Sequence, residues 1–171
     1  MSLPVVFLRL DLSEPSPAQL ASGRYSKRKF GWKGLTIRVE NEAGTFRRGR
    51  KPGGGEWETL MHFAYGEIAR TEGVDGDPVD VFLGPHMEEA PLVYVIHQRR
   101  VDDWENYDED KCMLGFLSEQ DAIDAFLSSY DDPRFLGPIT ALPVEEFIAK
   151  ARATRATPAM IKSRPLLVFR P

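Results

Sequence analysis

The chain has 171 residues, of which 42% are hydrophobic and 28% are charged, and these proportions fit one globular domain with a core. No apolar run approaches the roughly 18 residues of a membrane-spanning helix, so we expect no membrane partner. The stretch Pro4–Leu8 lacks the basic leading region and cleavage site of a signal peptide, so we expect none. The net charge of −4 excludes a general attraction to nucleic acid. The one cysteine, Cys112, excludes an internal disulfide and a cysteine-only metal site, and it fits a reducing, cytoplasmic location.

The charged residues are unevenly distributed along the chain. Residues 24–51 contain ten lysines and arginines, whereas residues 102–110 contain six aspartates and glutamates. Two interpretations remain open: the segments meet around a bound anion and its metals, or they form two solvated surfaces of opposite sign. Within the basic segment, Arg47–Lys51 either binds nucleic acid or forms a solvated hairpin tip.

The first half of the chain predicts a short helix and a hairpin. Ser16 is a suitable N-cap because a proline follows it at the first helical position. Apolar and polar residues alternate over Leu35–Glu40, which predicts a strand, and Thr45–Arg48 can return as its hairpin partner. Lys51–Gly55 predicts a flexible loop, and Trp57–Met61 is ambiguous.

The second half of the chain predicts further strands and then helices. We expect strands at Val79–Leu83, Pro91–His97, Lys111–Phe116 and Pro165–Phe169, and helices at Ser118–Tyr130 and Pro143–Arg152. Several short strands followed by helices favour the α+β class over an alternating α/β arrangement. The predicted architecture is a small antiparallel, OB-like β-barrel or curled sheet with two or three flanking helices.

A carboxylate-rich string lies at the mouth of one predicted strand. The residues Asp75–Val81 read DGDPVDV, and the glycine and proline shape a turn that can aim Asp75 and Asp77 at a common point. Asp80 lies inside the apolar run, where a carboxylate is costly to bury without a positive partner. A divalent cation such as Mg²⁺, which prefers oxygen ligands, meets that requirement. The alternative is an aspartate-rich turn without a metal.

With this string the chain resembles the family I inorganic pyrophosphatases, whose signature Asp75–Val81 matches without a gap. Tyr65–Ile68 is similar to the family's Tyr-Gly-Tyr-Ile segment, at the same distance before the signature. Gly44 and Arg50 are similar to its hairpin glycine and its substrate-binding arginine. The resemblance therefore covers more than one motif.

The resemblance also divides the chain. It covers a pyrophosphatase-like domain at residues 23–152, which leaves an N-terminal extension at 1–22 and a C-terminal extension at 153–171 that we expect to pack on the domain. Three segments most resemble pyrophosphatase-like domains encoded by phages, prophages and other mobile elements: residues 37–44, 62–84 and 107–116.

The resemblance implies hydrolysis of pyrophosphate with Mg²⁺, or with Mn²⁺ in its place. It implies that Asp75 and Asp80 bind metal and that Asp77 orients or deprotonates the attacking water. Arg50 and Tyr65 are implied to hold phosphate oxygens, and Tyr65 counts among the catalytic groups. Clustered metals can lower the pKa of a shared water, and a guanidinium suits phosphate, so the chemistry agrees with these roles.

Other positions depart from the family pattern. Glu109 and Lys111 keep the spacing between a metal-binding aspartate and a lysine, but a glutamate replaces the aspartate. We expect Asp108 or Glu109 to be a further metal ligand, unless they form a solvated acidic turn, and Lys111 to bind phosphate and act in catalysis. Arg38 and Glu40 keep a basic-x-acidic pattern after a two-residue slip, which predicts a substrate contact and a metal ligand.

One family residue is lost. The C-terminal Tyr-Lys pair corresponds to Tyr130 and Asp131, so the lysine is absent, and weaker substrate binding or a different phosphoanhydride substrate would follow. The alternative function is a catalytically degenerate module of this fold that binds phosphate or nucleotide ligands, or phage proteins. We expect a small-molecule partner and no nucleic-acid partner, and we leave a homo-oligomer open.

Overall fold

The computed structural model describes residues 16–22 and 26–162. Its elements are α1 Pro17–Ser22, β1 Lys29–Trp32, β2 Leu35–Asn41, β3 Phe46–Arg50, β4 Glu56–Leu60, β5 Ala64–Ile68, β6 Asp80–Leu83, β7 Leu92–Arg100, β8 Asp103–Leu114, α2 Glu119–Leu127, the 3-10 turn η1 Pro133–Phe135, β9 Ile139–Pro143 and α3 Val144–Ala153. No helix among them is both long and apolar enough to cross a membrane.

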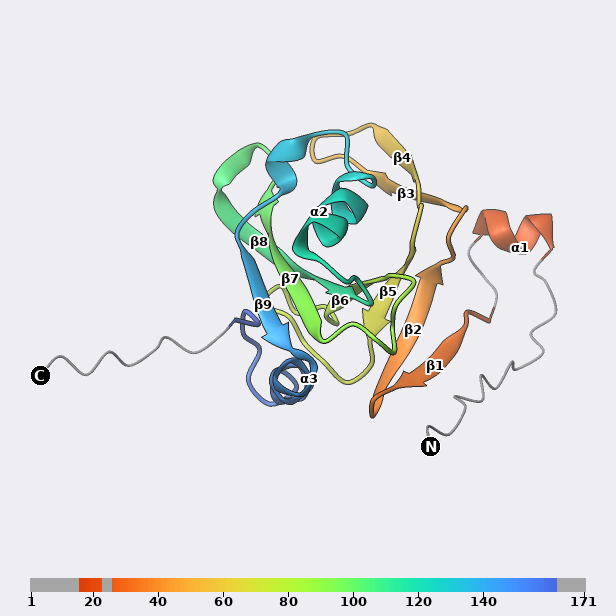
Figure 1. Ribbon diagram of the computed structural model, residues 1–171. Helices are drawn as coiled ribbons and strands as arrows, with labels where there is room; N and C mark the ends of the chain where they lie inside the picture. Colours follow the sequence, from red (N-terminus) through yellow and green to blue (C-terminus); the bar gives the residue numbers. More distant parts are fainter. Residues whose placement is uncertain (1–15, 23–25, 163–171) are drawn as a thin grey trace, which may run out of the picture.

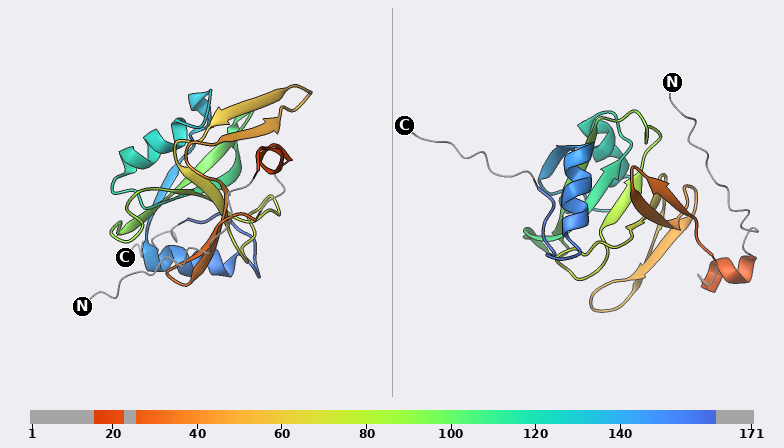
Figure 2. Two further views of the ribbon diagram at one scale, coloured as in Figure 1. Left: turned by 90° about the vertical axis from the view of Figure 1, so that its right-hand side faces the viewer. Right: turned by 90° about the horizontal axis from the view of Figure 1, so that it is seen from below.

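Seven strands form one sheet in the order β1-β2-β5-β6-β8-β7-β9, and it curls around α2 (Figure 1). Neighbouring strands run antiparallel except β6 and β8, which pair in parallel. The predicted α+β class, with a curled sheet and flanking helices, is confirmed. The strands β3 and β4 form a separate hairpin that projects from the body (Figure 2).

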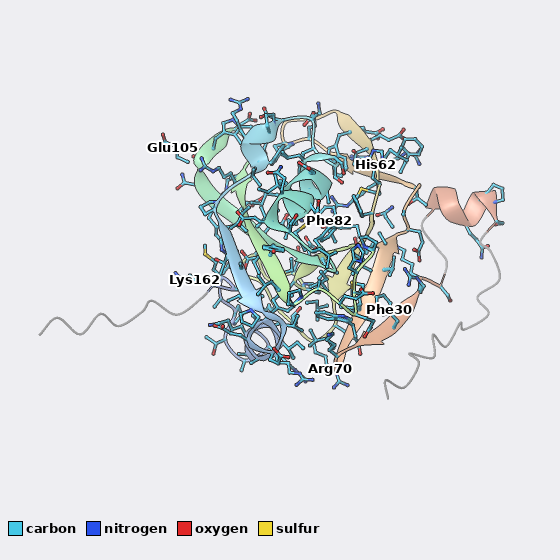
Figure 3. The ribbon with its side chains drawn as sticks, viewed as in Figure 1. Phe30, His62, Arg70, Phe82, Glu105 and Lys162 are labelled. Carbon is cyan, nitrogen blue, oxygen red and sulfur yellow. The ribbon has the colours of Figure 1, made fainter. Side chains whose placement is uncertain are left out.

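Alternating side chains give the sheet two apolar faces. One face packs against α2, and Phe82 lies at its centre, next to Tyr65 and Phe126 (Figure 3). The other face packs against α3, which contributes Phe147. In β6, Val81 and Phe82 are both buried because they point to opposite faces.

The helix α3 connects the two ends of the sheet. It follows β9 directly, and Arg152 Nη2 donates to the Gly34 carbonyl in the β1–β2 turn at 3.0 Å. Ile161 belongs to the same core, and its backbone N–H donates to Asp110 Oδ2 at 2.8 Å. The helix α3 thus links the β9 edge of the sheet to the β1–β2 turn, and the segment that follows it is attached to β8 through Ile161.

Most predicted elements are observed, and one pairing was wrong. Thr45–Arg48 does not return along β2, because β1 and β5 occupy both edges of β2 and Phe46–Arg50 pairs with Glu56–Leu60 instead. The hairpin turn lies at the three glycines 53–55, which all adopt positive φ. The alternative of a solvated acidic turn at residues 108–109 does not apply, because both residues lie within β8. The strand predicted at Pro165–Phe169 lies outside the described residues.

Gly66 sets the approach of β5 to β2. A Cβ at this position would lie 2.0 Å from the Arg38 carbonyl oxygen, which belongs to the backbone. Gly66→Ala should therefore lower the free energy of unfolding by at least about 2 kcal/mol, because the two strands must separate. Gly31→Ala in β1 is the matched control, since its Cβ would meet nothing closer than 4.0 Å. Urea unfolding of both variants measures the difference, and equal stabilities would contradict this account.

Candidate active site

Lys111 lies at the centre of a buried group of polar side chains. The parallel register places it beside Asp80, and its Nζ is 2.5 Å from Asp80 Oδ2 and 2.9 Å from Glu109 Oε1. The same ammonium donates to the Tyr65 hydroxyl at 2.9 Å. Lys111 is 2% exposed, so it depends on these partners, because an unpaired buried charge is strongly destabilising. We call these four residues the Lys111 cluster.

Burial and opposite charges set the pKa values in the Lys111 cluster. Burial disfavours the ionised form of Asp80, but the adjacent Lys111 ammonium outweighs it and lowers the pKa of Asp80. Burial raises the pKa of Glu109 to about 7; Lys111 opposes this rise and Asp80 adds to it. Burial also raises the pKa of Tyr65, so its hydroxyl stays protonated. The cluster therefore combines a fixed ion pair with a carboxyl group that titrates near neutral pH.

Gln98, which sequence analysis did not assign, links the Lys111 cluster to the end of α2. It is 5% exposed, and its Oε1 accepts a hydrogen bond from the Tyr130 hydroxyl. Its Nε2 lies 3.3 Å from Asp108 Oδ2 and 3.4 Å from Glu109 Oε1. Burial raises the pKa of Tyr130 to about 12, so this hydroxyl is a donor at neutral pH. The only sequence signal for Gln98 is an amide within the long apolar strand β7.

The hairpin brings Arg47, and not the predicted Arg50, to the Lys111 cluster. The Arg47 guanidinium carbon lies 4.4 Å from the Tyr65 ring centroid and 5.4 Å from that of Trp57. Along β3, residues 47 and 49 are half-buried while Arg50 is exposed, at the far end of the hairpin. Because successive side chains of a strand point to opposite faces, Arg47 and Arg50 cannot both face the cluster.

The turn before β6 carries the carboxylates of Asp75 and Asp77. Asp75 Oδ1 accepts the backbone N–H of Asp77 at 3.2 Å, and both side chains are exposed. Asp75 lines a narrow crevice that also receives Asp80, Glu109 and Asp110. The crevice lies between this turn and β8, and Asp77 is not among its lining residues.

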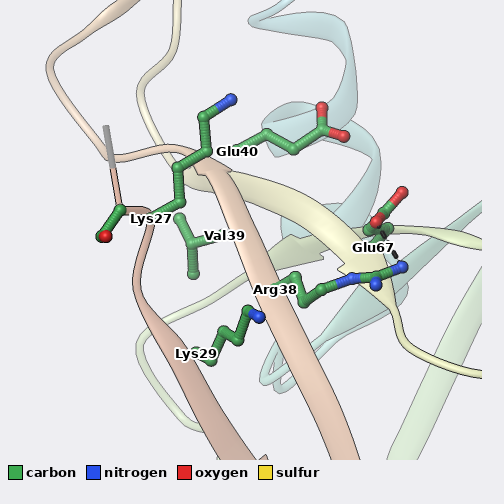
Figure 4. A pocket seen from close by; sticks show the side chains of 7 residues that line it. Lys27, Lys29, Arg38, Val39, Glu40 and Glu67 are labelled. Carbon is green, nitrogen blue, oxygen red and sulfur yellow. Dashed lines mark ion pairs between the residues drawn. The ribbon is translucent and has the colours of Figure 1, made fainter. Parts of the chain in front are cut away.

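Arg38 and Glu40 lie on a neighbouring part of the same face. Arg38 Nη2 is 2.6 Å from Glu67 Oε1, and these residues line one side of a pocket of about 440 Å³ (Figure 4). Burial raises the pKa of Glu40, and the Asp80 and Glu67 carboxylates add to that rise. Glu40 is thus within electrostatic reach of Asp80, as the predicted metal set requires.

The fit of a metal ion can be judged from the carboxylates. Within residues 16–22 and 26–162, no group of three His, Cys, Asp or Glu side chains converges closely enough to hold a metal. The crevice nevertheless gathers Asp75, Asp80 and Glu109, whose oxygens are the ligands that Mg²⁺ prefers. A cation there would favour the ionised form of Glu109, whose pKa burial raises. The oxygen donors are therefore of the type that a hard divalent ion prefers, but the described carboxylates do not converge on one point.

Three comparisons with known proteins bear on this site. The family model described as inorganic pyrophosphatase matches residues 17–152. The comparison with curated proteins and the comparison with solved structures gave no match. The matched range contains all of the Lys111 cluster together with Arg47 and Gln98.

The raised pKa of Glu109 predicts how stability depends on pH. Its pKa is about 7 in the folded chain, against 4.5 for an unperturbed glutamate. Between about pH 4.5 and pH 7 the folded state holds a proton that the unfolded state releases, so stability falls as pH rises. Glu109→Gln should remove this dependence and raise the free energy of unfolding above pH 7 by roughly 1–3 kcal/mol.

Urea unfolding from pH 4 to pH 8 in metal-free buffer with a chelator measures this effect. Glu105→Gln is the control, because Glu105 is exposed on the same strand. A pH profile for Glu109→Gln that matches the wild type would contradict the assignment.

Proposed function

Because the chain belongs to the inorganic pyrophosphatase family, we propose that it hydrolyses pyrophosphate to phosphate at the Lys111 cluster, in a reaction that requires Mg²⁺. The observation that carries the proposal is the buried Lys111 ammonium, with Tyr65, Asp80 and Glu109 around it. Phosphoanhydride hydrolysis needs cations and hydrogen-bond donors that are fixed around the transferred phosphoryl group. The cluster supplies both on the rigid strands of one sheet.

The carboxylates of the crevice are the proposed metal ligands. Asp75, Asp80 and Glu109 would hold Mg²⁺, with Glu40 or Asp108 as further ligands. When bound, the ion would neutralise phosphate charge and lower the pKa of a coordinated water. Mn²⁺, which also accepts oxygen ligands, would serve in its place.

The other side chains bind substrate and move a proton. With Asp80 and Glu109 bound to metal, Lys111 and Tyr65 would have donors free for phosphate oxygens. Arg47 lies beside Tyr65, where a guanidinium can contact the same phosphate. Asp77 accepts a proton from the attacking water, the role that its position in the family signature implies; its carboxylate is exposed. The bridging oxygen leaves with the second phosphate as the new P–O bond forms.

A degenerate binding module is the second candidate function. It is favoured by the position of the Lys111 ammonium, which already neutralises Asp80 and contacts Glu109. A site whose carboxylates are already paired with a lysine does not require a metal ion, and it can bind anions without hydrolysing them. Phosphate or nucleotide ligands would then bind to the same cations, and no turnover would be measured.

Phosphate release from pyrophosphate tests the proposed function. The wild-type protein should turn over only with Mg²⁺ or Mn²⁺, and Asp77→Asn should lower kcat by about 10²–10⁴-fold, the usual contribution of a general base. Asp102→Asn is the control, because Asp102 is an exposed turn residue whose positive φ an asparagine also tolerates. Absence of phosphate release by the wild type with either metal would reject the hydrolase and favour the binding module.

Two arginines of β3, Arg47 and Arg50, distinguish the substrate contact that the structure indicates from the one that the sequence pattern predicts. Arg47→Ala should lower kcat/KM for pyrophosphate by about 10²-fold, as the loss of one positioned donor does. Arg50→Ala should change it by less than about twofold, because Arg50 lies at the exposed end of β3. Steady-state phosphate release measures both, and a larger loss in Arg50→Ala would place the substrate elsewhere.

A further inference from the structure

A line of charged side chains crosses five adjacent strands on the face that carries the Lys111 cluster. The strand registers pair Lys29 with Arg38, Arg38 with Glu67, Glu67 with Asp80, and Asp80 with Lys111. Directly paired residues share a face of the sheet, so the five side chains form one row. Strands lie about 4.8 Å apart, and the row therefore extends over about 19 Å.

The row ends in a basic pocket. Its lining residues are Ser26, Lys27, Lys29, Arg38, Val39, Glu40 and Glu67 (Figure 4). Lys29 is exposed, and no carboxylate of the described residues forms an ion pair with its ammonium. Arg38 is paired with Glu67 through Nη2, but its Nε is buried without a hydrogen-bond partner in the described part of the chain. A buried donor without a partner is costly, and an incoming phosphate oxygen would satisfy it.

Lys29 lies too far from the Lys111 cluster to share a pyrophosphate with it. Three strand spacings separate Lys29 from Asp80, about 14 Å, whereas the two phosphorus atoms of pyrophosphate share a single bridging oxygen. Of the carboxylates in between, Glu67 is neutralised by its ion pair with Arg38. A ligand that reaches both ends must carry more phosphate groups.

We propose that this pocket binds the distal phosphates of a phosphoanhydride chain with three or more phosphates, while the terminal phosphate lies at the Lys111 cluster. The chemistry rests on the proposed function. Water adds to the terminal phosphorus, and the bond from that phosphorus to its bridging oxygen breaks. Orthophosphate and a chain shortened by one phosphate are released, together with a proton. Inorganic polyphosphates and nucleoside triphosphates both contain such a chain.

Lys29→Ala tests the pocket with pyrophosphate, inorganic tripolyphosphate and ATP as substrates. Loss of one charged contact should lower kcat/KM for tripolyphosphate by about tenfold and change that for pyrophosphate by less than about twofold. Lys51→Ala is the control, because it removes the same charge from the exposed hairpin loop outside the pocket. A selective loss with tripolyphosphate or with ATP supports the pocket and identifies which source of the chain it accepts.

Two kinetic outcomes overturn the proposal. Equal losses with pyrophosphate and the longer chains would mean that Lys29 attracts every anion, and unchanged rates with all three substrates would mean that it binds none.

If no substrate is hydrolysed, calorimetric titration with tripolyphosphate in the presence of a chelator separates the proposed pocket from the proposed hydrolase. Binding that weakens about tenfold in Lys29→Ala retains the pocket while the hydrolase fails. Binding that is absent, or equal in both proteins, removes the pocket.

Discussion

The buried ammonium of Lys111 is the interaction on which the site depends. A lysine that is 2% exposed must be surrounded by acceptors, and the pairing of β6 with β8 puts Asp80 beside it. Glu109 and the Tyr65 hydroxyl complete its surroundings from the same face. Because all four groups lie on the central strands β5, β6 and β8, their positions follow from the register of the sheet. Any change that shifts this register would move both the lysine and the carboxylates that define the site.

The strand β8 serves both faces of the sheet. The regular alternation of side chains along β8 leaves Glu109 and Lys111 on the face of the site, while Asp110 points to the other face. There Asp110 Oδ1 lies 2.6 Å from His97 Nδ1, and the other oxygen accepts the N–H of Ile161. His97 Nε2 in turn lies 2.8 Å from the Thr140 hydroxyl on β9. The acidic segment thus contributes Glu109 to the candidate site and Asp110 to the anchor of the C-terminal part of the core.

Local sequence was enough to predict the class of the fold, and it singled out several residues that the structure brings together. The string around Asp80 and the spacing of Lys111 pointed to residues that the structure brings into contact. Asp80 begins an apolar strand, and Lys111 directly precedes the apolar end of β8, so both strand segments are easily read. Arg47 was missed because its approach to Tyr65 depends on which strand the hairpin pairs with, and such non-local pairing is not encoded by spacing. Gln98 was missed because a single amide in a strand carries no signal until its cross-strand partner Glu109 is known.

The most direct measurement is the position of Mn²⁺ in crystals of the wild-type protein grown with phosphate, located by its anomalous scattering. The account predicts manganese bonded to Asp75, Asp80 and Glu109 in the crevice beside β8, with the phosphate in contact with Lys111 and Tyr65. Manganese bound elsewhere, or a crevice without manganese in which Lys111 keeps both of its carboxylate partners, would contradict the claim that the Lys111 cluster is a metal-dependent hydrolytic centre.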